Sequence, residues 1–150
     1  LKRKCPSCET EHFPRVNPVV IMLILSGDKV LLGRGAGWPE GAMSALAGFI
    51  SPGESMEEAV ARETYEEVGL KISNPRYIFS QPWPWPSQLM MGVICDAESE
   101  ALTINKDELE DARWFTRGEV QAVYNKTGDA FLRLPRFTIA HHLLRHWLEH

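Results

Sequence analysis

Residues 48–70 read Gly-Phe-Ile-Ser-Pro-Gly-Glu-Ser-Met-Glu-Glu-Ala-Val-Ala-Arg-Glu-Thr-Tyr-Glu-Glu-Val-Gly-Leu, and this stretch predicts a turn followed by a well-delimited helix. Ser55 and Glu58 have the spacing of a capping box, in which each side chain satisfies a free amide of the first helical turn. Gly69 stands where a left-handed residue commonly ends a helix. One apolar face repeats every four residues and should pack against a core. Its members are Met56, Val60, Thr64 and Val68.

The opposite side of this helix carries Glu63, Glu66 and Glu67. Their spacings of three and four put the carboxylates on one face, where each like-charge pair destabilises an isolated helix by about 0.2–0.5 kcal/mol. Most such runs are solvated acidic surfaces. Here, however, Arg62 is the only basic residue in the segment, so ion pairing should not offset the repulsion. A divalent cation can do so, and clustered carboxylates suit Mg²⁺ or Mn²⁺, which also bind substrate phosphates.

The same stretch resembles the Nudix box, Gly-x5-Glu-x7-Arg-Glu-U-x-Glu-Glu-x-Gly-U, where U is a bulky apolar residue. Thr64 and Leu70 fill the two U positions. All the fixed positions are matched, by Gly48, Glu54, Arg62, Glu63, Glu66, Glu67 and Gly69. The resemblance implies an α/β Nudix fold, with a mixed β-sheet sandwiched between α-helices. It also implies metal-dependent hydrolysis of a nucleoside diphosphate linked to another group.

The resemblance further assigns roles to residues in and near the box. It implies that Glu67, Glu63 and Glu66 are catalytic and hold the metal, together with the carbonyl of Ala47. A further carboxylate outside the box is expected to be Glu108, with Glu110 as the neighbouring alternative. Supporting roles in the loop are implied for Gly48, Glu54 and Arg62. Arg62 would hold the loop through Glu54, and Gly48 would let the backbone and a substrate phosphate approach each other closely.

A second motif lies at residues 80–87, Ser-Gln-Pro-Trp-Pro-Trp-Pro-Ser. It resembles the Ser-Gln-Pro-Trp-Pro-Phe-Pro-x-Ser motif of the NADH pyrophosphatase subfamily, although Trp85 replaces Phe and Gln88 occupies the expected serine position. Two tryptophans offer broad surfaces for stacking or packing; the alternative interpretation is a rigid loop that covers the core. The substrate-binding residues implied by the resemblance are Phe13, Phe49, Gln81, Pro82, Trp83, Pro84, Trp85, Pro86, Ser87, Gln88 and Ala140.

Cys5-Pro6-Ser7-Cys8 near the start has the spacing of half a tetrahedral zinc site. A closed site needs four ligands, and no second pair follows, so we expect the missing Cys-x-x-Cys to precede this chain. Residues 1–14 are thus interpreted as part of a zinc ribbon whose structural Zn²⁺ site is incomplete here. Residues 15–147 are interpreted as the Nudix domain and residues 148–150 as an expression-tag remnant.

Other segments predict the rest of an α/β fold. Strands are expected at residues 19–25, 30–32, 43–50, 77–80, 89–97, 102–104 and 112–115. Helices are expected at residues 116–123 and 138–148. Hairpins and helical crossovers together indicate a mixed sheet.

Composition agrees with a single domain, because the chain has 150 residues of which 44% are hydrophobic. The longest apolar run, at residues 19–25, is far shorter than the roughly 20 residues of a membrane-spanning helix, so no membrane is expected. Three cysteines and the absence of a signal-like N-terminus favour a reducing, cytoplasmic location. A net charge of −4 argues against general binding to a nucleic-acid backbone.

The subfamily resemblance implies hydrolysis of NAD(H) to nicotinamide mononucleotide and AMP, with NAD-capped RNA as a further substrate. It also implies a homodimer with substrate near the interface. Two alternatives are an ADP-ribose or ADP-sugar pyrophosphatase and a regulator that binds nucleotides without cleaving them. The complete glutamate set argues against the regulator, which does not need all its metal ligands.

Overall fold

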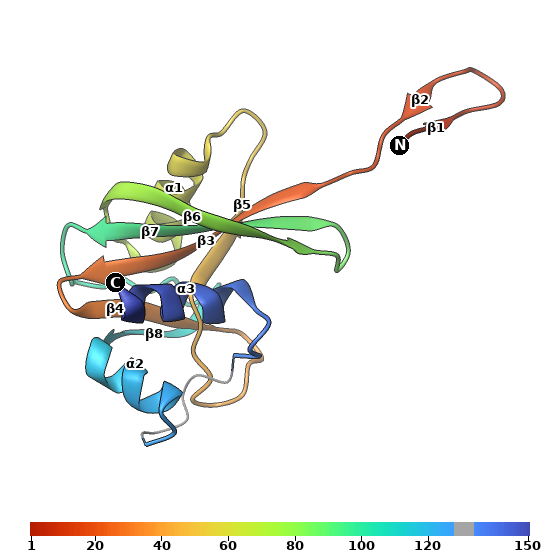
Figure 1. Cartoon of the computed structure of the whole chain (residues 1–150). Helices are drawn as coiled ribbons and strands as arrows, with labels where there is room; N and C mark the ends of the chain where they lie inside the picture. Colours follow the sequence, from red (N-terminus) through yellow and green to blue (C-terminus); the bar gives the residue numbers. More distant parts are fainter. Residues whose placement is uncertain (128–133) are drawn as a thin grey trace.

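The computed structural model describes residues 1–127 and 134–150. Its centre is a six-stranded sheet with the order β6–β7–β3–β4–β8, in which β5 also pairs with β3 (Figure 1). β3 and β7 run parallel, whereas the other neighbours are antiparallel, so the predicted mixed sheet is confirmed. The strands are β3 (Asn17–Ser26), β4 (Lys29–Gly35), β5 (Leu46–Phe49), β6 (Ile72–Trp83), β7 (Gln88–Ala97) and β8 (Leu109–Thr116).

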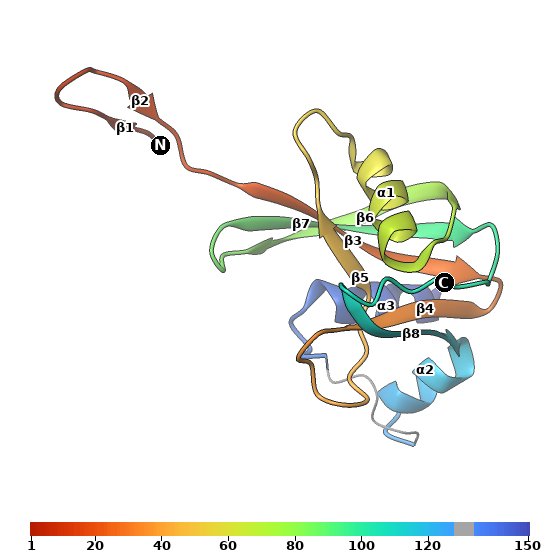
Figure 2. The ribbon, with the colours of Figure 1, turned by 180° about the vertical axis from the view of Figure 1, so that it is seen from behind.

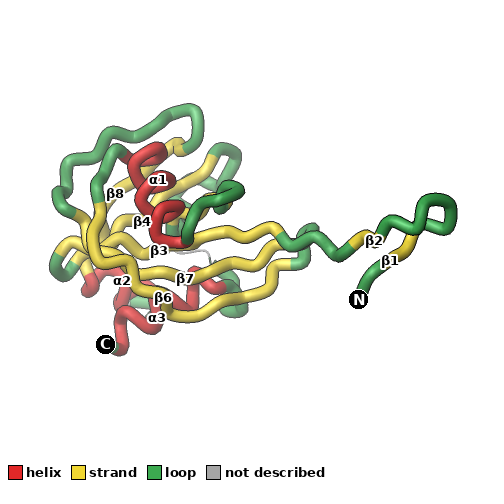
Figure 3. The backbone as a smooth tube through the Cα atoms, turned by 90° about the horizontal axis from the view of Figure 1, so that it is seen from above, coloured by secondary structure: helices red, strands yellow, loops and turns green. Residues whose placement is uncertain are grey.

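Helices cover both faces of this sheet. Alternate side chains of β3 enter two separate cores, because successive residues of a strand point to opposite faces. Val20 and Met22 pack in the core beneath α1 (Met56–Val68), whereas Ile21 and Leu23 pack in the core beneath α2 (Arg117–Tyr124) and α3 (Ile139–Glu149). Figures 2 and 3 show α1 on one side of the strands and the other two helices on the opposite side.

The predicted helix is confirmed as α1, including both of its ends. Ser55 Oγ accepts from the Glu58 amide at 3.2 Å, and the Ser55 amide donates to Glu58 Oε2 at 2.8 Å. At the other end Gly69 has φ +71° and its amide donates to the Tyr65 carbonyl at 2.9 Å. The local capping signals therefore fix where the acidic face begins and ends.

The strand predicted at residues 102–104 is wrong. The Thr103 amide donates to the Val68 carbonyl and the Asn105 amide to the Glu67 carbonyl, both at 2.9 Å. These backbone groups satisfy carbonyls at the end of α1 instead of joining the sheet. The segment thereby connects the last turn of α1 to the loop that leads into β8.

β6 is longer than predicted and extends through Trp83. Gln81, Pro82 and Trp83 therefore belong to a strand and pair with the start of β7 rather than forming a loop. Only residues 84–87 form the turn, which contains a cis Trp85–Pro86 peptide bond.

The N-terminal residues form a separate two-stranded hairpin, β1 (Arg3–Lys4) and β2 (Glu11–His12), which stands away from the main sheet (Figures 1 and 2). Cys5 and Cys8 lie in its turn. Among the described residues, no third metal-binding side chain gathers with these two thiols.

At the other end, α3 continues through Leu148 and Glu149, beyond the predicted domain boundary at residue 147. Leu148 packs against the core, and Glu149 Oε1 accepts from Arg145 Nε at 2.7 Å. No helix within residues 1–127 and 134–150 is both long and apolar enough to cross a bilayer.

Candidate active site

Three carboxylates meet at one end of α1. Glu63 and Glu67 come from this helix and Glu108 from the loop before β8, and one oxygen of each lies within 4.8 Å of the others. Glu66, which the sequence grouped with them, is not in this cluster. Its Oε2 accepts from Arg62 Nη1 at 2.9 Å, and about half of its side chain is exposed. We call Glu63, Glu67 and Glu108 the carboxylate cluster.

Arg62 binds the surrounding loop with its whole guanidinium group. Its Nε and Nη2 form a bidentate pair with Glu54, at 2.6 and 2.8 Å. Nη1 donates to Glu63 and Glu66, at 2.8 and 2.9 Å, and Nη2 also donates to the Phe49 carbonyl at 2.9 Å. The expectation that one arginine cannot offset the acidic face is therefore wrong for Glu63 and Glu66, because the planar fork of Arg62 reaches both of them.

Glu67 has a different environment. The residue is 7% exposed, and Oε2 has no hydrogen-bond partner among the described residues. Burial is the main reason that the pKa of Glu67 is raised to about 8, followed by the charges of Glu63, Glu108 and Glu66. A buried carboxylate beside like charges favours a bound cation. The oxygen ligands and the unpartnered buried atom thus fit a hard divalent ion such as Mg²⁺ or Mn²⁺.

Asn105 positions Glu108 and was not identified from the sequence. Its side-chain amide donates to Glu108 Oε1 at 3.1 Å, while its backbone amide is bonded to the Glu67 carbonyl. The alternative candidate, Glu110, lies elsewhere: its Oε2 pairs with Arg34 Nη1 at 2.6 Å. Of the two acidic residues that the sequence left open, the structure brings Glu108 into the cluster.

Gly48 is required by the position of Glu63. A Cβ atom built at residue 48 would overlap the Glu63 carboxyl group. The sequence predicted the close approach of a phosphate at this glycine, whereas the group that comes close to it in the structure is a cluster carboxylate. Because Gly48 pairs with Val20 in the β3–β5 ladder, the backbone there is held in place by the sheet.

A pocket of about 480 Å³ opens beside the carboxylate cluster. It runs from the cluster toward the N-terminus of α3, and aromatic side chains of Trp38 and Trp83 line it. Five residues that the sequence predicted for the site meet here. They are Ala47, Glu67, Trp83, Glu108 and Ala140.

Other predicted substrate residues do not line this pocket. Gln81 connects β6 to α3, since its Nε2 donates to the Phe137 carbonyl at 2.7 Å and its Oε1 accepts from the Ile139 amide at 2.8 Å. Ser87 Oγ accepts from Asn17 at 3.3 Å. The remaining residues lie in the turn between β6 and β7, in these two strands or on exposed surface elsewhere. They are Phe13, Phe49, Pro82, Pro84, Trp85, Pro86 and Gln88.

One wall of the pocket is formed by the segment before α3, of which the sequence interpretation predicted only Thr138, as the start of a helix. Leu134, Pro135 and Thr138 line it. Phe137 lies beside it, with its ring stacked on Trp83 at a centroid separation of 6.1 Å and an interplanar angle of 17°. The position of this segment depends on the hydrogen bonds from Gln81.

Replacing Glu54 with glutamine should reduce activity moderately, by about tenfold, since Glu54 acts through Arg62 and loop placement. Hydrogen bonds from Arg62 and the Ser51 amide lower the pKa of Glu54 to about 2. Because the pKa of Glu54 is lower in the folded protein than in the unfolded chain, Glu54 adds to the free energy of unfolding above about pH 4.5, and this contribution is lost as the pH falls toward 2. Thermal unfolding should therefore show a deficit of E54Q at pH 7 that narrows below pH 4; an equal deficit at both pH values would contradict this role.

Comparisons with known proteins agree with this geometry. The NUDIX domain model matches residues 15–134. NAD-capped RNA hydrolase NUDT12 of Homo sapiens is 47% identical over 99% of this chain and 34% of its own length. The mitochondrial NAD(P)H pyrophosphatase NUDT13 of Mus musculus is 40% identical over 99% of this chain and 46% of its own length. The chain thus spans less than half the length of these two relatives.

Solved structures show the same fold. A NUDIX hydrolase from Nitrosomonas europaea superposes with a TM-score of 0.74 at 24% identity, over 99% of this chain and 78% of that one. The family model covers most of the chain, including the box that carries two residues of the carboxylate cluster. The protein is a member of the Nudix family.

Proposed function

We propose that this protein hydrolyses the pyrophosphate bond of NAD(H), giving nicotinamide mononucleotide and AMP, and that it acts on NAD-capped RNA by breaking the same bond. The observation that carries the reaction is the carboxylate cluster at the mouth of an aromatic-lined pocket. The substrate is supported by the two relatives, one named an NAD-capped RNA hydrolase and the other an NAD(P)H pyrophosphatase.

Glu63, Glu67 and Glu108 are proposed to hold Mg²⁺ or Mn²⁺, with the Ala47 carbonyl as a further ligand. When bound, such an ion neutralises pyrophosphate charge and favours attack by water. Glu66 is proposed to assist from the rim, where it shares Arg62 with Glu63. Arg62 itself is proposed to keep the loop in place, because its five donors are used by protein groups.

Glu67 is proposed to take the proton of the attacking water. Its Oε2 is buried, is free of hydrogen bonds from the described residues, and belongs to a residue that lines the pocket. Trp83 supplies an aromatic face in the same pocket. Exclusion of water by these surfaces strengthens the charge interactions of the cluster.

Two further features are proposed on the family resemblance. Cys5 and Cys8 are two ligands of a structural zinc ion, and the chain is proposed to bind zinc poorly because these thiols are half of a closed site. A homodimer with substrate near its interface is also proposed. Light scattering tests the dimer, and metal analysis of C8S beside the unchanged chain tests zinc.

Replacing Trp83 with alanine should weaken the preference for NADH over ADP-ribose. Stacking on an aromatic side chain contributes roughly a tenfold to hundredfold gain in affinity per base. Trp85 contacts Trp83 edge-on, with ring centroids 5.1 Å apart, but does not line the pocket. W85A should therefore change the substrate preference less than W83A does, and W85F should change it only mildly. The measurement is the ratio of kcat/KM for the two substrates. An unaltered ratio in folded W83A would contradict a substrate role.

Side-by-side turnover tests the choice among related activities. We expect NADH and NAD-capped RNA to be cleaved with higher kcat/KM than ADP-ribose, in either Mg²⁺ or Mn²⁺. A clear preference for ADP-ribose would support the ADP-sugar pyrophosphatase alternative. Tight nucleotide binding without turnover of any of these substrates would support the regulator.

A further inference from the structure

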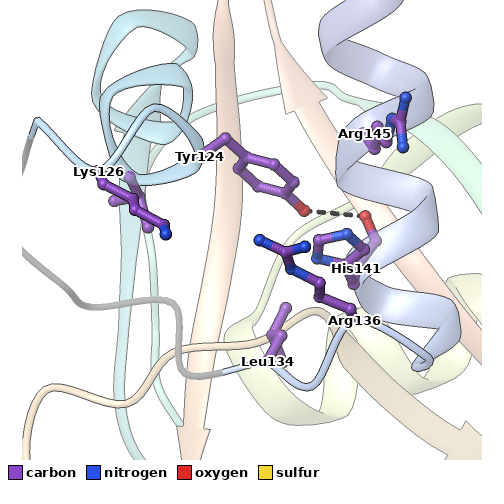
Figure 4. Close-up of a pocket in the computed structure, with 7 residues that line it drawn as sticks. Tyr124, Lys126, Leu134, Arg136, His141 and Arg145 are labelled. Atoms are coloured by element: carbon purple, nitrogen blue, oxygen red, sulfur yellow. Dashed lines mark hydrogen bonds between the residues drawn. The ribbon is translucent and has the colours of Figure 1, made fainter.

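A second pocket, of about 370 Å³, lies between the end of α2 and the side of α3 (Figure 4). Basic side chains dominate its lining, and no carboxylate is among the described residues that line it. The basic residues are Lys126, Arg136, His141 and Arg145. We call this the basic pocket. The reaction proposed above does not use it.

The concentration of positive charge here is unusual for a chain of net charge −4. Arg145 pairs with Glu149 at 2.7 Å, whereas Lys126 and Arg136 form no ion pair within residues 1–127 and 134–150. The pKa of His141 is lowered, first by burial and then by the charges of His142, Arg136 and Arg145. Like charges gathered in a concave site attract an anion.

Lys126 occupies a backbone position that lysine rarely adopts. It follows the C-cap of α2 with φ +59°, and its amide donates to the Val123 carbonyl at 3.1 Å, while Thr127 donates to the Ala122 carbonyl at 2.8 Å. This is the helix-ending arrangement in which glycine is usual. A glycine would relieve the backbone strain but would remove an ammonium group from the pocket.

The walls of the basic pocket are joined to each other. Tyr124 Oη on α2 donates to the His141 carbonyl on α3 at 2.8 Å, as Figure 4 shows. The two rings also stack, with centroids 5.0 Å apart and planes at 27°. A hydrogen bond and a ring contact therefore hold α2 and α3 together at the basic pocket.

The basic pocket adjoins the active-site pocket. Leu134 lines both cavities, and the next two residues divide between them: Pro135 lines the active-site pocket and Arg136 the basic pocket. The two cavities therefore meet along this segment, and the basic pocket lies next to the cavity that contains Glu67 and Glu108.

We propose that the basic pocket binds a phosphate group carried on the adenosine ribose of the substrate, next to the pyrophosphate being cleaved; this inference rests on the proposed function. Two substrates have such a group. One carries a 2′-phosphate, as in the phosphorylated form of the dinucleotide, and the other carries a 3′-phosphodiester, as in capped RNA. The 2′-phosphate is a dianionic monoester and the 3′-phosphodiester is monoanionic, but both offer anionic oxygens that Arg136 and Lys126 would bind.

Binding of product-like probes tests the site without turnover. Calorimetry would compare AMP, adenosine 2′,5′-bisphosphate and adenosine 3′,5′-bisphosphate on the unchanged chain. At least one bisphosphate should bind about tenfold more tightly than AMP, as expected for an added charge-assisted contact. If only the 2′,5′-bisphosphate binds more tightly than AMP, the ligand of the pocket is the 2′-phosphate of the dinucleotide. If only the 3′,5′-bisphosphate does so, the ligand is the phosphodiester of capped RNA.

Variants then test whether the added affinity for a bisphosphate comes from the basic pocket. R136Q and K126G should each remove most of this added affinity. K126G should keep the thermal stability of the unchanged chain, because glycine suits the backbone conformation at residue 126. R113Q is the matched control: it removes one positive charge from an exposed residue of β8 outside both pockets and should keep the full gain.

The outcomes separate the two proposals. Equal affinity of the unchanged chain for AMP and both bisphosphates overturns the phosphate site, as does a gain that survives in folded R136Q and K126G. Absence of NADH cleavage would instead contradict the proposed function while leaving the calorimetric comparison valid.

Discussion

Replacing Glu67 with glutamine is expected to lower kcat by about 10²–10⁴-fold, the range typical of losing a general acid or base. The amide keeps the shape of the side chain but neither binds a divalent ion as a carboxylate does nor accepts a proton at neutral pH. The effect should exceed that of E54Q, because Glu67 lines the pocket whereas Glu54 acts through Arg62. Steady-state rates at saturating Mn²⁺ measure the difference.

Stability measurements separate this loss from misfolding. Without metal, the pKa of Glu67 is raised to about 8, so the folded protein holds this proton more tightly than the unfolded chain does. The contribution of Glu67 to stability is then present below about pH 4.5 and is lost as the pH rises through about 8. In chelator at pH 8, E67Q should unfold at no lower temperature than the unchanged chain. Near-normal turnover by E67Q would place the chemistry elsewhere.

Replacing Gly48 with alanine is expected to reduce kcat/KM by about 100-fold, the scale associated with a displacement of roughly 1 Å in an active site. The added methyl group would occupy the position of the Glu63 carboxyl group, which must then move away. That movement disturbs the 2.8 Å contact from Arg62 and the spacing of the carboxylate cluster. Activity and the thermal shift produced by Mn²⁺ should fall together.

Gly118 provides the matched control. A Cβ atom at this residue meets nothing closer than 4.0 Å, and residue 118 lies in the first turn of α2. Because alanine suits a helix better than glycine, G118A should leave activity unchanged and stability equal or slightly higher. If G48A retained activity comparable to G118A, the packing of Glu63 against residue 48 would not matter for function.

The parts of the site that were predictable from sequence are those fixed by local spacing. Ser55, Glu58 and Gly69 mark the ends of α1, so the positions of Glu63 and Glu67 on one helical face followed directly. The pattern could not separate Glu66 from the cluster. The place of Glu66 outside the cluster and its contact with Arg62 depend on side-chain directions that spacing alone does not determine.

Contacts between distant segments account for what was missed. The choice of Glu108 over Glu110 depends on Asn105, which is bonded to the end of α1. Gln81 was expected to contact substrate, yet its amide holds the segment before α3, and this contact brings Leu134 and Thr138 to the pocket. Neither arrangement follows from local spacing, because each depends on hydrogen bonds between residues more than 30 positions apart.

Product analysis of NADH hydrolysis tests the proposed function most directly. The unchanged chain, incubated with NADH and either Mg²⁺ or Mn²⁺, should release AMP and reduced nicotinamide mononucleotide in equal amounts, and chelator should stop the reaction. Chromatography resolves both products, and E67Q provides the inactive reference. Release of nicotinamide and ADP-ribose, or equal rates for E67Q and the unchanged chain, would contradict cleavage of the pyrophosphate by the carboxylate cluster.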